Sequence, residues 1–292
     1  MHVPVLLNET IDGLDIHKGD VVFDGTVGDG GHSEAVCKRY GRNVHLIMSD
    51  RDMNSLDTAK ERLQDLECKK MFYHGSFDQI KTILEKAGLK KVQRAMLDLG
   101  YSSTQLEFSG RGFSFGKDEP LLMTLDNPYS GGLTAKEIVN SWKEEEIYEL
   151  LKVYGEERFS GRIAKKIVEA RRKNPINTTG ELVKIVESAI PFRSKINPAT
   201  KTFQALRIAV NDELKKVEEA IDVIFENLST GGRLAIISFH SLEDRIIKNK
   251  FRNLQKEGRG TVITKKPIAP TREEIKNNSR SRSAKLRIIE HA

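Results

Sequence analysis

A glycine-dense segment between Asp24 and Ser33 carries the clearest chemistry in this sequence. The apolar run Val21 to Phe23 ends in Asp24 and opens directly into a turn with four glycines, ahead of His32. Glycines let a backbone approach a ligand closely, and the N–H groups at the start of a following helix remain free to bind it. The segment therefore predicts a strand, a tight loop and a helix start that hold a nucleotide-like cofactor.

The spacing of the glycines narrows the class of cofactor. A dinucleotide site has the pattern G-x-G-x-x-G, whereas the order here is G-x-x-G-x-G-G followed by His32. S-adenosylmethionine has no diphosphate, and it needs only a shaped turn beside its amino-acid tail and a carboxylate for its ribose hydroxyls. Asp50 suits that second role, because it closes the next apolar run at close to the usual offset of roughly 20 residues. Ordinary glycine turns, with Asp50 as a helix cap, remain the alternative.

Other polar or aromatic residues follow the remaining expected strands. Phe77 comes just after a short third strand, Asp98 ends a fourth strand near 94–97, and His240 follows a fifth strand near 233–239. Ligands of open parallel sheets bind outside the carboxyl ends of the strands, where the strand order reverses. Phe77 is then either an adenine-stacking ring or a core residue. A single histidine such as His240 is more often a structural hydrogen bonder.

These residues suit methyl transfer without a metal. Transfer from a sulfonium is an in-line displacement, so its catalysis consists mainly of alignment and exclusion of water. If the acceptor is an exocyclic amine, Asp98 can accept its N–H while the nitrogen pyramidalises. We therefore expect Asp98 to be the catalytic residue and no metal to be required.

The elements that must position these side chains alternate between strand and helix in the first third of the chain. This alternation predicts an α/β fold with a parallel sheet covered on both faces. A helix over 53–66 shows apolar residues every three or four positions, and Asp78 is expected to cap the next helix, which Gly88 ends. A turn at Gly231 and Gly232 precedes the fifth strand.

The alternation stops for about a hundred residues after the fourth strand, which is too long for an unstructured connection. Thr134 with Glu137 and Thr178 with Glu181 fit capping boxes, and 159–168 gives a further helix an apolar face. A helical domain therefore interrupts the sheet between its fourth and fifth strands.

Composition sets broad limits on function. The chain has 292 residues, 38% hydrophobic, and 48 Lys and Arg against 42 Asp and Glu, a net charge of +6 that suits a polyanionic partner without requiring one. Cys37 and Cys68 form no CxxC, and we expect apolar fillers in a reducing compartment rather than a disulfide or metal ligands. The sequence shows no run of about 18 apolar residues and no charged leader, so we expect a cytoplasmic protein without a membrane partner.

Several motifs in a fixed order resemble the bacterial RsmH (MraW) family of S-adenosylmethionine-dependent methyltransferases, which act on cytosine N4 in small-subunit ribosomal RNA. The resemblance runs nearly end to end. Besides the glycine loop and the initial HVPVLL, it covers DLG at 98–100, RGFSF at 111–115, YGEERF at 154–159, TFQALRI at 202–208, SFHSLEDR at 238–245 and RSAKLR at 282–287.

The resemblance implies a Rossmann-like S-adenosylmethionine methyltransferase sheet with an inserted all-helical domain. The expected ranges are 1–106 with 209–292 for the sheet, and 107–208 for an insert that recognises the substrate. It implies a cytidine in the decoding region of 16S ribosomal RNA as substrate and the small ribosomal subunit as partner, while a homodimer stays open. The implied cofactor contacts are Gly30, Gly31, His32, Asp50, Phe77, Asp98 and Gln105.

The chain departs from the family pattern in a few places. Leu122 and Thr124 stand where the family usually has an acid and a base, Tyr101 where a small apolar residue is usual, and Lys201 where Arg is common. The paired departure keeps open a noncatalytic RNA-binding or assembly factor. A methyltransferase of other nucleic-acid specificity also stays open, whereas the missing G-x-G-x-x-G disfavours a nicotinamide oxidoreductase.

An RNA substrate would be read at unpaired or flipped bases, because the A-form major groove is too narrow for side chains. Basic residues should line the approach, although charge runs are as often solvated faces. One group recurs at roughly helical spacing and a second lies near the C-terminus: Arg158, Arg162, Lys165, Lys166 and Arg172, then Lys265, Lys266, Arg280, Arg282, Lys285 and Arg287.

Overall fold

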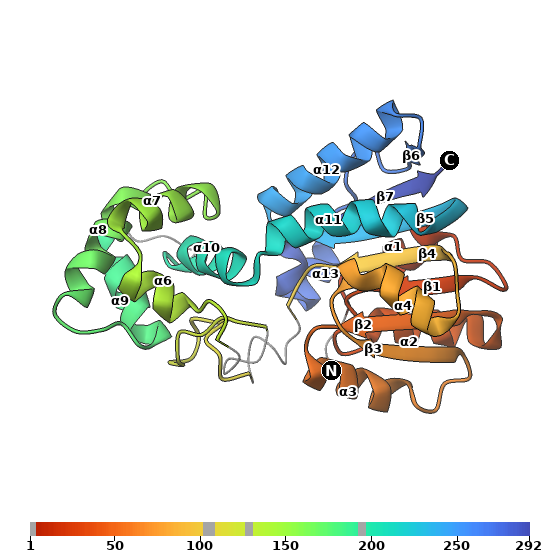
Figure 1. Cartoon of the computed structure of the whole chain (residues 1–292), viewed down its shortest axis with the longest axis horizontal. Helices are drawn as coiled ribbons and strands as arrows, with labels where there is room; N and C mark the ends of the chain where they lie inside the picture. The colour runs from red at the N-terminus through yellow and green to blue at the C-terminus, as the bar shows by residue number, and fades with distance from the viewer. Residues whose placement is uncertain (1–3, 102–108, 126–130, 192–196) are drawn as a thin grey trace. The chain divides into compact units, whose positions relative to one another are not determined.

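The computed structural model describes residues 4–101, 109–125, 131–191 and 197–292, and the chain divides into two compact units (Figure 1). Unit 1 comprises Met1–Ser102 and Leu214–Ala292, and unit 2 comprises Ser103–Glu213. The expected boundary at 208/209 would have divided the helix α10 (Thr200–Asn211), which belongs to unit 2 as a whole.

Unit 1 is built on a seven-stranded sheet in the order β3-β2-β1-β4-β5-β7-β6. Neighbouring strands from β3 to β5 run parallel, and β7 is antiparallel to both β5 and β6. Because chain order reverses between β1 and β4, the carboxyl ends of these two strands form the switch point where ligands of open sheets bind. The strands are β1 (Val21–Asp24), β2 (His45–Asp50), β3 (Lys69–His74), β4 (Val92–Asp98), β5 (Leu228–Ser238), β6 (Gly260–Val262) and β7 (Lys285–His291).

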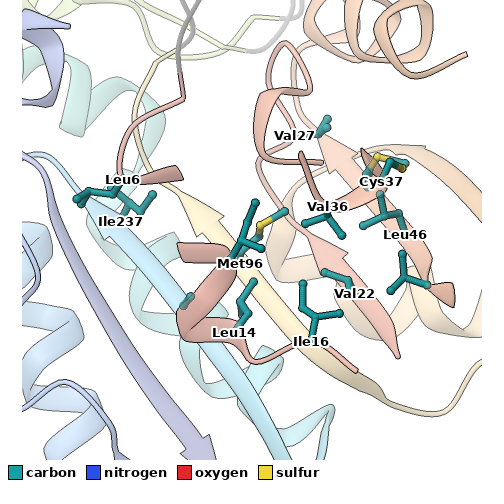
Figure 2. Close-up of a cluster of buried hydrophobic side chains, with 14 of the residues drawn as sticks. Leu6, Leu14, Ile16, Val22, Val27, Val36, Cys37, Leu46, Met96 and Ile237 are labelled. Atoms are coloured by element: carbon teal, nitrogen blue, oxygen red, sulfur yellow. The ribbon is translucent and has the colours of Figure 1, made fainter. Parts of the chain in front are cut away.

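Helices cover both faces of this sheet, so successive residues of a central strand are buried on opposite sides. Val22 and Met96 belong to one core cluster, which Figure 2 shows, whereas Phe23 and Leu97 belong to the other. The first cluster is completed by α1 (Leu7–Leu14), α2 (Gly31–Tyr40) and α3 (Met53–Leu63), and the second by α4 (Ile80–Ala87), α11 (Glu213–Glu226) and α12 (Ser241–Lys256). Short helical elements complete the unit: η1 (Gly41–Asn43), η2 (Phe77–Gln79), α13 (Arg272–Asn277) and η3 (Ser279–Ser283).

The structure corrects two local expectations in this unit. The turn expected at Gly231 and Gly232 lies inside β5, as an irregularity where the register against β4 shifts. Gly231 has a φ of 71°, and a Cβ on Gly232 would lie 2.7 Å from the carbonyl oxygen of Ser229, so both positions favour glycine. Asp78 does not cap α4, because it lies within η2 and Gln79 takes the N-cap position.

The expectation that the two cysteines stay unpaired is wrong. Cys37 and Cys68 are joined by a disulfide, with 5.4 Å between their Cα atoms. Cys37 lies on α2 and Cys68 immediately precedes β3, and both side chains are buried in the first core cluster. Packing of α2 on the sheet brings together two positions that are far apart in sequence.

From residue 135 onward, the described part of unit 2 is mainly helical, whereas its residues 109–125 form no helix. The two predicted caps are confirmed, since the Thr134 side chain accepts the N–H of Glu137 and Thr178 forms a capping box with Glu181. No helix among the described residues of either unit is long and apolar enough to cross a membrane. With α10, the helices among the described residues of unit 2 are α6 (Ala135–Ser141), α7 (Glu144–Val153), α8 (Ser160–Arg171) and α9 (Thr179–Ala189).

Candidate active site

The glycine loop connects β1 to α2 and lies close against its surroundings. Gly30, the N-cap of α2, has a φ of 82°, and an added Cβ would lie 3.3 Å from Ala59 on α3. The N–H of Val27 donates to the carbonyl of Ser49 over 3.0 Å, which ties the loop to the end of β2. The loop is therefore held between β2 and α3 in a conformation that needs glycine at its last position.

Gly31 and His32 join the loop to the N-terminal segment. A side chain on Gly31 would collide with the ring of Pro4. The Nε2 atom of His32 lies 3.0 Å from the carbonyl oxygen of Val5. Because a carbonyl oxygen only accepts, we assign the ring proton to Nε2.

His32 is a neutral hydrogen-bonding group rather than a cation. Burial lowers the pKa of its imidazole below the ordinary value, although the nearby Asp24 acts in the opposite direction. Its Nδ1 atom, 3.8 Å from Oδ2 of Asp98, then carries a lone pair. The two groups therefore do not form an ion pair at neutral pH.

Asp50 ends β2 and anchors the glycine loop through its carboxylate. Oδ2 accepts the N–H of Gly28 and Oδ1 accepts the N–H of Asp52, each over 2.9 Å. The side chain is buried, and burial raises its pKa to about 6. A backbone hydrogen bond from Arg51 also favours the charged form, and with about four lone-pair sites the carboxylate keeps some capacity to accept from a ligand. The hydroxyl groups of a ribose suit that capacity.

Phe77 follows β3 in η2 and lies against the start of the glycine loop. A Cβ on Gly25 would lie 2.7 Å from Cβ of Phe77 and 2.5 Å from Cδ2 of Leu97. The Phe77 side chain is half-buried and packs against the second core cluster. It therefore combines both sequence interpretations, with part of its surface in the core and part left for contact with a flat ligand.

Asp98 ends β4 beside Asp24 at the switch point. Its backbone N–H donates to Oγ1 of Thr26 over 2.6 Å, and the side chain is 21% exposed. Sequence reasoning did not single out Thr26, although its position two residues after a strand end suits a link from the loop to the neighbouring strand. The Asp98 carboxylate is thus placed next to the loop and remains accessible to a substrate.

Asp24 itself is a buried support of the loop. Its carboxylate accepts the hydroxyl of Ser33 over 2.6 Å and the N–H of Thr26 over 3.3 Å. Burial raises its pKa to about 6, against the lowering effect of Ser33. Asp24 therefore joins the end of β1 to the first turn of α2.

His240 lies at the end of β5 and caps α12. Its Nδ1 accepts the N–H of Glu243 over 3.4 Å, and the Glu243 carboxylate accepts the N–H of His240 over 3.3 Å. This reciprocal arrangement is a capping box, in which the histidine takes the place usual for serine or threonine. His240 is therefore a structural hydrogen bonder that caps α12, one of the two roles considered from its sequence position.

The structure brings most of the expected site residues to one edge of the sheet. The loop positions, His32, Asp50, Phe77 and Asp98 are linked there by the contacts given above, whereas Gln105 lies outside the described residues. Backbone N–H groups, the Asp50 carboxylate and an aromatic ring suit the amino-acid tail, ribose and adenine of S-adenosylmethionine. The partly exposed carboxylate of Asp98 beside them suits the acceptor of its methyl group.

The C-terminal basic group is not one continuous exposed surface. Arg287 is 6% exposed, and its Nε donates to Asp244 over 2.6 Å. Lys285 donates to the other oxygen of Asp244 over 3.1 Å. These two cations hold β7 against α12, which sequence spacing alone did not reveal.

Known proteins resemble this chain over nearly its whole length. The model of the MraW methylase family matches residues 1–292. A Clostridium botulinum (strain Kyoto / Type A2) protein named ribosomal RNA small subunit methyltransferase H is 47% identical, over 98% of this chain and 97% of its own. The protein of that name from Clostridioides difficile (strain 630) is 44% identical over 99% and 98%. The solved structure of an rRNA methylase from Streptococcus thermophilus is 10% identical with a TM-score of 0.45, over 100% of this chain and 98% of its own.

Proposed function

The chain belongs to the MraW methylase family, and we propose that it methylates N4 of a cytidine in the decoding region of 16S ribosomal RNA, with S-adenosylmethionine as methyl donor. The relatives named ribosomal RNA small subunit methyltransferase H support ribosomal RNA as the substrate. The observation that carries the proposal is the meeting of the glycine loop, Asp50 and Asp98 at the switch point of the sheet.

The donor is bound by groups that the fold holds ready. Asp50 would accept hydroxyl groups of the ribose with the lone pairs that its backbone donors leave unused. Phe77 would hold the adenine, and the loop ending in Gly30 and Gly31 would hold the amino-acid tail. Because Asp50 is already fixed by two backbone hydrogen bonds, little side-chain entropy is lost when the donor binds.

The bound donor would supply an electrophilic methyl group on a sulfonium, and the electron pair of the broken C–S bond would stay on the sulfur and leave S-adenosylhomocysteine. Asp98 accepts a hydrogen bond from the exocyclic amine of cytosine, which directs the nitrogen lone pair along the line of attack. As the nitrogen becomes tetrahedral and cationic, the Asp98 carboxylate stabilises the developing charge and takes the proton. Because His32 is neutral, it does not pair with the Asp98 carboxylate as a cation.

The proposed substrate also indicates a partner, a cellular compartment and a role for unit 2. We propose the small ribosomal subunit as the partner and the cytoplasm as the compartment, and a substrate-recognition role for unit 2. A single-stranded or flipped cytidine is required, because a paired base does not present its N4 lone pair to a methyl donor.

A second candidate, a noncatalytic RNA-binding factor, was motivated by Leu122 and Thr124. The backbone of this segment is nevertheless held in unit 2, where the Asn211 side chain accepts the N–H of Leu125 over 2.8 Å and donates to the carbonyl of Met123 over 2.8 Å. The departures therefore leave an ordered segment. Since the cofactor residues in unit 1 are also intact, catalysis is the better-supported proposal.

The test is a transfer reaction with purified protein. Small ribosomal subunits from cells that lack the protein are incubated with S-adenosylmethionine labelled in the methyl group, and the RNA is digested to nucleosides. We expect the label in N4-methylcytidine, and none with the Asp98→Asn variant. Label in another nucleoside would refute the N4 assignment, and no label despite normal subunit binding would favour the noncatalytic factor.

A further inference from the structure

Unit 2 carries a surface on α7 and α8 in which aromatic rings alternate with cations. We define this aromatic–cation face by Tyr148, Lys152, Arg158, Phe159 and Arg162. The three cations are exposed and the two rings are half-buried. We propose that this face binds a single-stranded segment of RNA, an inference that rests on the proposed RNA substrate and assigns it a docking surface on unit 2.

Each ring of the face lies beside at least one cation. The Cζ atoms of Arg158 and Arg162 lie 5.8 and 5.9 Å from the ring centroid of Phe159. The Nζ atom of Lys152 lies 5.1 Å from the centroid of Tyr148. These distances are within the range of cation–π attraction, which orders long side chains that would otherwise sweep through solvent. The charges are therefore held next to the rings.

The two rings belong to one surface because α7 and α8 pack together at Gly161. A Cβ on Gly161 would lie 3.8 Å from Cδ2 of Tyr148, so the tyrosine ring lies alongside the start of α8 with room for a methyl group between them. Gly161 stands between Phe159 and Arg162 in sequence. The tyrosine of one helix is therefore near the arginine-bearing start of the other.

The charge of the face is only partly neutralised by neighbouring acids. Lys152 lies 3.8 Å from Glu149, and the adjacent Lys166 lies 3.0 Å from Glu169. Within the described part of the chain, no carboxylate forms an ion pair with Arg158 or Arg162. Two guanidinium groups are thus left to bind an anionic partner, and planar guanidinium matches phosphate geometry.

A single-stranded RNA fits this combination better than other anionic partners. Phosphates pair with the guanidinium groups, while unpaired bases stack on aromatic rings at about 1–3 kcal/mol per base. A duplex hides its bases from such rings, and an acidic peptide offers carboxylates but few flat groups. The alternation of ring and cation therefore favours an unpaired strand.

The test measures binding of the full chain to a fluorescent single-stranded RNA by anisotropy, at several salt concentrations. The variant carries Arg158→Ala and Arg162→Ala. The matched control carries Lys136→Ala and Lys184→Ala, which remove two exposed charges from α6 and α9, helices that lie apart from α7 in Figure 1. A third variant, Tyr148→Leu, removes one ring without changing the charge.

We expect the arginine pair to weaken binding on the order of tenfold and to lower the salt slope by about 1.4, because each phosphate contact on a single strand contributes about 0.7. Tyr148→Leu should weaken binding several-fold with an unchanged slope. The control pair should bind as the wild type does, and all variants should keep the wild-type melting temperature. Equal losses of affinity in the arginine and control pairs would refute RNA binding by the aromatic–cation face. Equal affinity for a duplex of the same length would refute its preference for an unpaired strand.

The outcome is separable from the proposed function. If the wild type transfers methyl groups to ribosomal RNA while the arginine pair binds RNA normally, this inference fails and the proposed function stands. If the wild type transfers no methyl group but binds single-stranded RNA through the arginines, the surface stands and the proposed function fails.

Discussion

Replacing Asp50 by Asn separates the structural from the ligand-binding role of this carboxylate. The pKa of Asp50 is about 6 in the folded protein, against 3.8 for the ordinary group. The folded state keeps the proton to higher pH than the unfolded chain does. Ionisation of Asp50 therefore destabilises the ligand-free protein as pH rises through this window, by about 3 kcal/mol at neutral pH.

Asn at position 50 does not ionise, so the variant avoids the free-energy cost of a buried charge, but it loses a hydrogen bond. Its amide has one acceptor oxygen, so either the N–H of Gly28 or that of Asp52 loses its partner, at about 1–3 kcal/mol. The two effects nearly cancel, and we expect the free energy of unfolding to change by less than about 2 kcal/mol. In the Asp50→Asn variant, the donor loses charge-assisted hydrogen bonds to its ribose. We expect its binding free energy to weaken by about 2–3 kcal/mol, which raises Kd on the order of a hundredfold.

Isothermal titration with S-adenosylhomocysteine at pH 7.5 measures this loss, and urea denaturation measures the stability. The matched control is Asp52→Asn, which removes a neighbouring buried carboxylate but keeps the N-cap of α3, because Asn caps as well as Asp. Wild-type affinity in Asp50→Asn, or an equal loss in the Asp52→Asn control, would refute the ribose-binding role.

The pH dependence gives an independent check of the same reasoning. Ribose binding uses the ionised carboxylate, so the wild-type Kd should rise as pH falls through about 6, by up to tenfold per unit. Asp24 also has a pKa of about 6, and its contribution remains in the variant. The difference between wild type and Asp50→Asn therefore isolates Asp50, and parallel pH profiles for the two proteins would contradict its role.

Three further predictions concern the remaining parts of the site and its support. Asp98→Asn should lower methyl transfer at saturating donor by at least about a hundredfold while the donor Kd changes only a few-fold, and unchanged turnover would remove Asp98 from the mechanism. Phe77→Leu keeps the apolar packing but loses the stacking ring, so titration should show roughly a tenfold weaker Kd, and full affinity would return Phe77 to a purely core role. Reduction of the Cys37–Cys68 disulfide, whose positions are 31 residues apart, should lower the free energy of unfolding by about 3–4 kcal/mol, and identical urea curves with and without dithiothreitol would show that the bond is absent.

The strands that carry the site could be predicted from sequence because each is a short apolar run that ends in a charged residue. Asp24, Asp50 and Asp98 end β1, β2 and β4 as the pattern indicated. Their meeting at one edge follows from parallel pairing, which the alternation of strand and helix already implied. The local sequence was therefore sufficient to predict the strand ends, and the general geometry of parallel sheets was sufficient to predict that they meet at one edge.

Other features depend on contacts that local sequence does not encode. The final strand β7 escaped prediction because it carries the cations Lys285 and Arg287, and the charge of the buried Arg287 becomes compatible with burial beside Asp244. The disulfide escaped for the same reason, since it depends on how α2 packs near the start of β3. The raised pKa of Asp50 is likewise a consequence of tertiary burial.

The most direct test of the central claim is mass spectrometry of nucleosides from small-subunit RNA, in cells with the protein, without it, and with the Asp98→Asn variant in its place. We predict that N4-methylated cytidine is present with the wild-type protein and lost in the other two strains. Unchanged N4-methylcytidine in the strain that lacks the protein would contradict the account.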